Sequence, residues 1–218
     1  MPAPTGLRER KKERTRRLIA DTARRLFAER GFEAVTVADI ARAADVAPKT
    51  VFNYFPTKED LFYRRLEAFE DELLAAVRGR EPGESALAAF RGFLMRRGGV
   101  LQMGDVGDDA EATRQLRTVT RVITESPALL ARERQVMGRY EEALAELLAA
   151  ETGAPQEAAE PRAAANALLG VHRSLIGYVR ARTLAGATAS EVAGEIRVEA
   201  DAAFARLEAG LGAYAIRS

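Results

Sequence analysis

Hydrophobic residues recur along this chain every three or four positions, and no stretch alternates with the period of two that marks a half-buried strand. The pattern therefore predicts helices, which glycine, proline and capping residues divide from one another. Near the N-terminus we expect a helix over residues 8–30 that ends at Gly31. Thr36 and Thr57 are each followed three positions later by an aspartate, as in a capping box, and each is expected to begin a helix.

The helix that begins at Thr57 is expected to continue to about residue 80. Weaker signals predict five more helices, over about 84–97, 109–124, 127–151, 161–184 and 190–214. The predicted fold class is all-α, with about nine helices. We expect two domains, a three-helix N-terminal one over residues 1–56 and a helical C-terminal one over residues 57–218.

The stretch between the two capping boxes has the spacing of a helix–turn–helix. Ile40 is expected to be buried on the first helix, and Val46 to fill the corner between the two helices. Val51 and Phe55 lie four residues apart, so they share the core-facing side of the second helix. The opposite side is polar and hydrogen-bonding, which suits a helix that enters the major groove of DNA.

On that outer side, Lys49 can donate to guanine O6 and N7, and Thr50 can use its hydroxyl or its methyl group. Phe52 has two interpretations, since its ring could fill the core or contact a thymine methyl. Tyr54 and Lys58 are better placed for phosphates, as are the first turns of the helices that begin at the capping boxes. The residues expected to contact DNA are Thr36, Val37, Pro48, Lys49, Thr50, Phe52, Asn53, Tyr54, Lys58, Arg16 and Arg17.

Charge strengthens this interpretation. The whole chain has a formal net charge of +1, but residues 1–65 carry 15 Lys/Arg against 9 Asp/Glu, whereas residues 66–218 carry 18 against 23. The arm over residues 8–17 alone holds seven positive and two negative side chains. It could be an ordinary solvated helix start, but beside a helix–turn–helix we interpret it as a phosphate-neutralising arm.

Composition excludes several other classes. The chain has no cysteine and one histidine, so disulfides, thiolate metal sites and histidine metal clusters are excluded, and no cofactor is expected. Its apolar runs are far below the ~20 residues of a membrane span, and its basic N-terminus has no apolar segment of a secretory signal. We therefore expect a cytoplasmic protein. An enzyme is disfavoured because catalytic motifs are absent and the carboxylates lie on polar helix faces; a helical adaptor protein is the third interpretation.

Residues 14–62 resemble the DNA-binding domain of TetR/AcrR-family transcriptional regulators. The resemblance rests on three stretches: Ala23 to Phe32, Thr36 to Val46, and Thr50 to Leu61. Two departures are mild: Ala47 replaces a polar capping residue, and Asn53 stands where an aromatic is common. Both are expected to shift operator choice without abolishing binding. The resemblance implies a homodimeric repressor that a small-molecule effector releases from a palindromic operator.

The resemblance also implies that the C-terminal helices bind the effector, which we expect to be apolar or amphipathic. Arg121 and Arg173 are possible anchors for an acidic ligand, and the stretches around residues 124–127 and 170–173 faintly resemble family members that bind acyl-CoA-like molecules. The residues expected to line the pocket are Phe90, Phe93, Leu94, Leu116, Val119, Ile123, Met137, Tyr140 and His172. Each of these side chains also has the simpler interpretation of ordinary core.

In the same family the last two helices pair with those of a second copy. Apolar stripes with helical spacing run along both of the corresponding helices here, and a dimer is what reading two half-sites requires. The residues expected at the dimer interface are Leu168, Leu175, Val179, Val192, Ile196, Ala203, Leu207 and Leu211.

Overall fold

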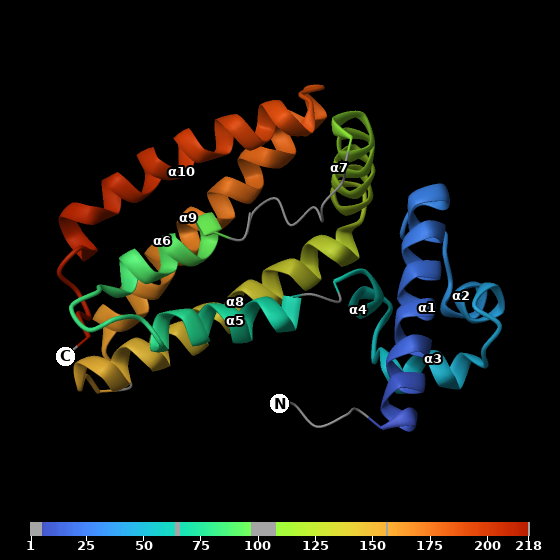
Figure 1. Cartoon of the computed structure of the whole chain (residues 1–218), viewed down its shortest axis with the longest axis horizontal. Helices are drawn as coiled ribbons and strands as arrows, with labels where there is room; N and C mark the ends of the chain where they lie inside the picture. Colours follow the sequence, from blue (N-terminus) through green and yellow to red (C-terminus); the bar gives the residue numbers. More distant parts are fainter. Residues whose placement is uncertain (1–5, 64–65, 97–107, 156, 218) are drawn as a thin grey trace. The chain divides into compact units, whose positions relative to one another are not determined.

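The structure is a computed structural model, and it describes residues 6–63, 66–96, 108–155 and 157–217 (Figure 1). The all-α prediction is confirmed, because the regular elements within these ranges are ten helices. They are α1 (Leu7–Arg30), α2 (Val37–Ala43), α3 (Pro48–Tyr54), α4 (Lys58–Phe62), α5 (Leu66–Arg78), α6 (Ala86–Arg96), α7 (Asp109–Thr124), α8 (Pro127–Thr152), α9 (Ala159–Leu184) and α10 (Ala189–Leu211). Residues 97–107, where the helices predicted over about 84–97 and 109–124 are joined, lie outside the described residues.

The single helix predicted from Thr57 to about residue 80 is wrong, since the chain forms α4 and α5 there. Tyr63 caps α4 with φ −93° and ψ 32°, so its ψ has left the α-helical range. Its hydroxyl donates to the carbonyl of Leu129 at 3.3 Å, and its ring meets that of Phe62 edge-on at 5.1 Å. The hydrogen bond to Leu129, 66 positions away in sequence, holds the end of α4, and no helical periodicity could have predicted it.

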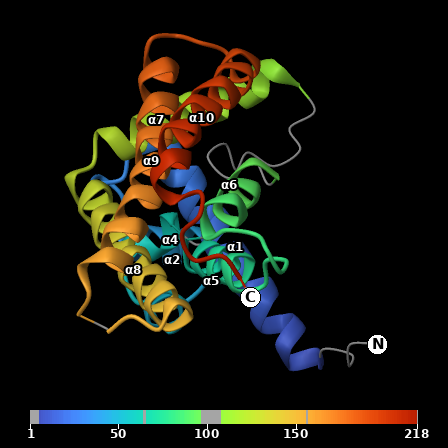
Figure 2. The ribbon, with the colours of Figure 1, turned by 90° about the vertical axis from the view of Figure 1, so that its left-hand side faces the viewer.

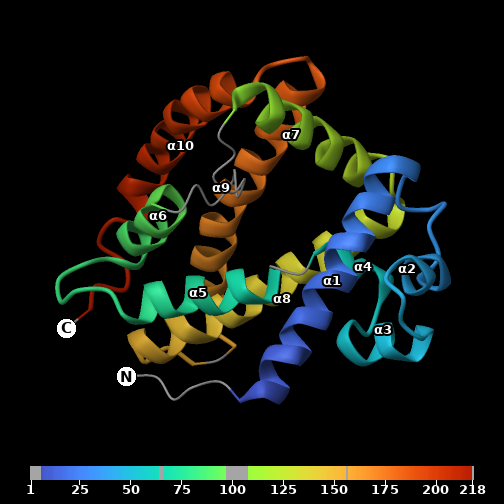
Figure 3. The same cartoon turned by 45° about the vertical axis from the view of Figure 1, so that its right-hand side comes forward.

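The chain forms two compact units, of which the first is Met1–Leu66 together with Arg121–Arg132. Figure 3 shows α1 beside the pair formed by α2 and α3. One hydrophobic core holds the unit together, and its members include Ile19, Leu26, Phe27, Phe32, Ile40, Val51, Phe55, Leu61, Val122, Ile123 and Leu129. Because Leu61 and the α7–α8 junction share this core, we propose that the N-terminal domain extends past the predicted boundary at residue 56.

Polar contacts also tie the α7–α8 junction to this unit. Ser126 donates to the carboxylate of Glu33 at 2.6 Å, while its oxygen accepts the N–H of Leu129 at 3.2 Å and so caps α8. Arg132 donates to Asp60 at 2.8 Å, and Asp60 also completes the capping box of α4. The start of α8 is therefore held by the Arg132–Asp60 ion pair, by the Ser126 cap and by the hydrophobic core of the unit.

The second unit is Glu67–Thr120 together with Glu133–Ser218. Figures 1 and 2 show α9 and α10 side by side as an antiparallel hairpin. Phe90 of α6 meets Phe204 of α10 at 6.2 Å between ring centroids, and this pair anchors α6 on the hairpin. A second aromatic group, centred on Phe69, lies among α5, α6, α8 and α9.

Candidate nucleic-acid interface

The first helix of the helix–turn–helix is set by its cap. The N–H of Asp39 donates to the Thr36 hydroxyl at 3.1 Å, and the Thr36 N–H donates to the Asp39 carboxylate at 3.0 Å, so the predicted capping box is confirmed. The hydrogen bonds from the Thr36 side chain and backbone, with smaller help from Arg42, hold the pKa of Asp39 below its usual value. The carboxylate therefore stays charged and keeps the start of α2 fixed.

The turn between α2 and α3 is tight. Asp45 has φ 53°, a left-handed conformation that aspartate adopts more readily than most residues. The N–H of Val46 donates to the carbonyl of Ala41 at 2.9 Å, which closes the turn onto the end of α2. Pro48 then begins α3, where its missing N–H leaves no intrahelical hydrogen bond unmade.

The recognition helix α3 has the two faces that the spacing predicts. Val51 and Phe55 are buried, whereas Lys49, Phe52 and Asn53 are exposed. The ring of Phe52 is 52% exposed, which decides between its two interpretations, since it is not part of the core. Pro48 and Thr36 are also exposed, and Val37, Thr50 and Tyr54 are half-buried. All the predicted contact residues of α3 are thus at least partly accessible.

Two predicted phosphate contacts lie against aromatic rings. The Lys58 ammonium is 4.2 Å from the ring centroid of Phe32, and the Arg16 guanidinium carbon is 5.6 Å from that of Phe55. The neighbouring Arg17 differs, because its Nε donates to Glu13 at 2.8 Å. Sequence reasoning did not find the roles of these two rings, although both belong to the stretches that carry the family resemblance.

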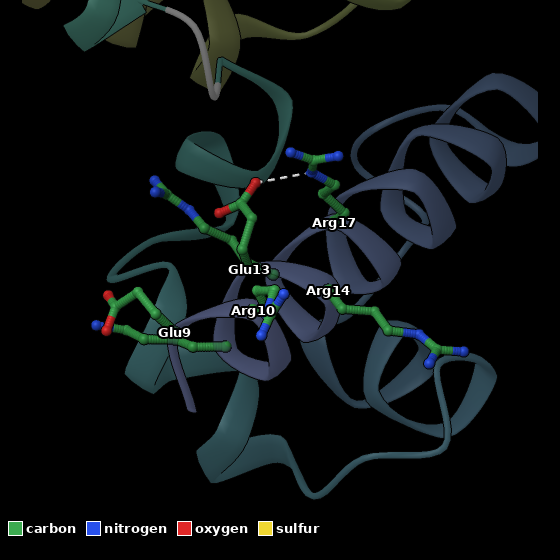
Figure 4. A pocket seen from close by; sticks show the side chains of 7 residues that line it. Glu9, Arg10, Glu13, Arg14 and Arg17 are labelled. Atoms are coloured by element: carbon green, nitrogen blue, oxygen red, sulfur yellow. Dashed lines mark hydrogen bonds and ion pairs between the residues drawn. The ribbon is translucent and has the colours of Figure 1, made fainter. Parts of the chain in front are cut away.

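The basic arm forms the first three turns of α1. Its side chains line an open depression of about 620 Å³ (Figure 4). In that view Glu13 and Arg17 turn toward one another, while Arg14 extends away from them. All the arm residues from Glu9 to Arg14 are exposed, so their positive charge is available to a polyanion.

The part of the chain that the structure describes contains no group of three histidine, cysteine, aspartate or glutamate side chains that could hold a metal ion. None of its helices combines the length and the hydropathy that crossing a membrane requires.

Two family descriptions match this chain. "Bacterial regulatory proteins, tetR family" matches residues 19–64, which include α2, α3 and α4, and "MftR C-terminal domain" matches residues 96–212, more than half of the chain. The chain belongs to the TetR family. It is therefore a DNA-binding transcriptional regulator with a helix–turn–helix.

Relatives of known name agree with this assignment. The HTH-type transcriptional regulator TcmR of Streptomyces glaucescens is 33% identical over 152 residues, which cover 70% of this chain and 66% of TcmR. MftR of Mycobacterium tuberculosis is provisionally named a mycofactocin biosynthesis transcriptional regulator. It is 29% identical over an alignment that covers 74% of this chain and 78% of the MftR chain. Among solved structures, Salmonella enterica GusR has a TM-score of 0.55 at 20% identity, covering 91% and 95% of the two chains, and supports the fold.

In this TetR-family chain the predicted pocket residues do not all come together. Phe93, Tyr140 and His172 gather around Phe69, which the sequence prediction missed. Phe69 was missed because the predicted pocket residues all came from the helices after residue 84, whereas Phe69 lies on α5, before them. Phe90, Leu94, Leu116 and Met137 are buried, as the ordinary-core interpretation also requires.

Two predicted pocket residues on α7 have different surroundings. Val119 is 46% exposed on α7, and Ile123 belongs to the core of the first unit with Val122 and Leu129. The cause is that α7 contributes to both units, since the division falls between Thr120 and Arg121. The helical period shows which residues of α7 share a face. It does not show at which residue the helix passes from one unit into the other.

His172 contributes an imidazole to the Phe69 group. Its imidazole stacks on the Phe69 ring with centroids 5.0 Å apart and 15° between the planes. It is 3% exposed, and its Nδ1 is buried without a hydrogen-bond partner among the described atoms. Burial lowers the pKa of His172 to about 4, so the imidazole is neutral at pH 7.

The predicted dimer stripe is mostly used within one chain. The side chains that are buried between α9, α10 and their neighbours are those of Leu168, Leu175, Val179, Val192 and Ile196. Because these five are buried within the chain, we propose that accessible residues of α9 and α10 meet a second copy instead. Ala203, Leu207 and Leu211 are half-buried.

Proposed function

We propose that this TetR-family regulator is a homodimeric repressor that binds a palindromic operator and is released by a small apolar or amphipathic effector. The observation that carries the DNA-binding part is the α3 helix, whose buried Val51 and Phe55 aim Lys49, Phe52 and Asn53 outward. A short helix with this outer face fits the major groove, where Lys49 can reach guanine and the Phe52 ring can contact a thymine methyl. A target on chromosomal DNA would place the protein in the cytoplasm.

Dimerisation is proposed on the outer face of the α9–α10 hairpin. With the predicted stripe buried, the accessible side of α9 presents Ser174, Gly177 and Ala181 at helical spacing. The accessible side of α10 presents Gly194 and Val198, with further small residues beyond them. Small side chains let helices approach closely, and a symmetric contact of this kind would present two recognition helices to two half-sites.

The effector is proposed to bind at the Phe69 group, where the Phe69 ring packs on Phe93 and Tyr140 and stacks on His172, whose Nδ1 is buried without a described partner. Two fold neighbours at 19% and 17% identity were solved with apolar or amphipathic ligands: FadR of Bacillus subtilis with stearoyl-CoA, and SmeT with triclosan, with TM-scores of 0.51 and 0.56. They support the same class of ligand for this chain, and an acyl-CoA-like effector is one candidate within it.

Release requires the effector to prefer the conformation that does not bind DNA. The separate helices α4 and α5, in place of the one helix expected from Thr57 to about residue 80, lead from the first unit into the second. The chain also passes between the two units within α7 and within α8. We therefore propose that all three passages transmit the change, which would alter the separation of the two recognition helices.

One set of experiments separates this function from the alternatives. Selection from random duplexes, followed by gel shift, should yield a palindrome that the purified dimer retains at physiological salt. Turnover of a substrate without DNA binding would support an enzyme, and a stable heteromeric partner without DNA binding would support an adaptor. With an effector in hand, saturating operator must weaken effector affinity by the same factor as effector weakens operator affinity. Equal affinities with and without DNA would overturn the release mechanism.

A further inference from the structure

Most arginines of the first unit whose contacts are described are paired with carboxylates. A carboxylate neutralises the charge that a DNA phosphate would otherwise meet, so a paired arginine must exchange partners before it binds DNA. The paired residues are Arg17 with Glu13, Arg24 with Asp21, Arg25 with Glu29, Arg42 with Asp39, and Arg132 with Asp60.

Lys58 is held in a different way. Its ammonium lies 4.2 Å from the centroid of the Phe32 ring, where the negative face of the ring attracts a cation without cancelling its charge. A free lysine loses much rotamer freedom when it binds, because four carbons carry its charge. A lysine already seated on a ring loses less of that freedom when a phosphate arrives.

The Phe32 ring is itself fixed. It is 2% exposed, and it packs at 4.9 Å from the Phe27 ring and at 6.5 Å, edge-on, from the Phe62 ring. Its neighbours therefore determine its orientation, and the ring in turn fixes the direction from which Lys58 presents its ammonium. Arg16 repeats the arrangement over Phe55, with its Nε buried and without a partner among the described atoms.

We propose that Phe32 is a positioning residue for DNA binding, whose buried ring holds the Lys58 ammonium where it contacts an operator phosphate. The proposal rests on the proposed function and adds a residue that does not touch DNA. The affinity for DNA that Lys58 contributes would then depend on both the lysine and the Phe32 ring beneath it.

A double-mutant cycle tests this, using fluorescence anisotropy with the selected operator at several salt concentrations. Lys58→Ala should weaken binding and lower the salt slope by about 1, because one phosphate contact is lost. Phe32→Leu should weaken binding about two- to fivefold with little change in slope, because the charge remains but is no longer held. In the Lys58→Ala background, Phe32→Leu should have no further effect.

Phe204→Leu is the matched control, since it removes a buried ring of the second unit that packs on Phe90 and that no described cation contacts; it should leave affinity unchanged. If Phe32→Leu does not fold, fluorinated phenylalanine at position 32 keeps the shape of the ring and weakens its negative face, and affinity should fall with each added fluorine. An equal cost of the Phe32 change with and without Lys58, or no cost at all, would overturn the positioning role while leaving DNA binding intact. Absence of binding by the unmodified protein to any selected sequence would instead overturn the proposed function.

Discussion

Arg80 and Glu151 form a two-point ion pair in the second unit, with Nη1 3.0 Å from Oε1 and Nη2 2.6 Å from Oε2. The Arg80 side chain is 1% exposed and that of Glu151 is 24% exposed. Arg80 also donates to the carbonyls of Val77, Glu84 and Ala215 at 2.6–3.1 Å. One guanidinium thus joins the end of α5, the loop before α6, the end of α8 and the segment after α10.

Arg80→Met should therefore destabilise the protein by about 3 kcal/mol, since it leaves a half-buried carboxylate and three carbonyls without their donor. Glu151→Gln should lower the free energy of unfolding by less, because the guanidinium of Arg80 keeps its hydrogen bonds to the three carbonyls. Urea unfolding at one protein concentration measures both. Arg91→Ala is the control, since Arg91 and Asp201 form an exposed pair at 2.9 Å that should contribute within about 0.5 kcal/mol. Equal midpoints for Arg80→Met and Arg91→Ala would contradict the role of this contact.

His172 should make stability fall in mild acid. Its folded pKa is about 4, below the ordinary value of 6.5, so the unfolded chain takes up a proton first as pH falls. The stability that comes from keeping His172 neutral is fully present above pH 6.5 and is lost between pH 6.5 and 4. About 2 kcal/mol of the free energy of unfolding is lost by pH 5. His172→Leu should remove that loss, which unfolding at pH 7.5 and pH 5 measures. Since the chain has no other histidine, an equal loss in the variant would show that His172 is not the cause.

Dimerisation should depend on Val198, which is 69% exposed on α10. Val198→Glu should cost the single chain little, but it would place charge in the close contact proposed between two hairpins. Sedimentation should then show monomer with unchanged helical circular dichroism. Val119→Glu is the matched control, since that valine is 46% exposed on α7, and it should remain a dimer. A dimeric Val198→Glu would show that the copies meet elsewhere.

Operator choice should depend on the outer face of α3. Lys49→Ala and Thr50→Ala should each cost about 1–3 kcal/mol on the preferred site and relax base preference there, because a base contact is lost. Lys11→Ala, in the exposed arm, should instead weaken all sequences by a similar factor. Binding to a panel of single-base operator variants separates the two patterns. Unchanged site preference in both α3 variants would refute their assignment as base-reading residues.

Local chemistry made several elements predictable from the sequence. The capping boxes at Thr36 and Thr57 and the opposite faces of α3 depend on residues three or four apart, and the structure has them as predicted. The same reasoning could have found the cap of α10, where Thr188 accepts from the N–H of Glu191 at 3.2 Å, because threonine and glutamate have that spacing too. The prediction started this helix at Ser190 and missed the pattern.

What the sequence determined by itself was which residues share a helix, a face and a cap, because those relations follow from the 3.6-residue period and from hydrogen bonds within one turn. Only the tertiary structure decided what covers each face. The stripe that includes Leu168 and Val192 could equally have met a second copy or its own chain, and it is buried within the chain. Likewise, the ring of Phe32 and the ammonium of Lys58 are 26 positions apart in sequence, and only the shared packing of Phe27, Phe32 and Phe62 places them together.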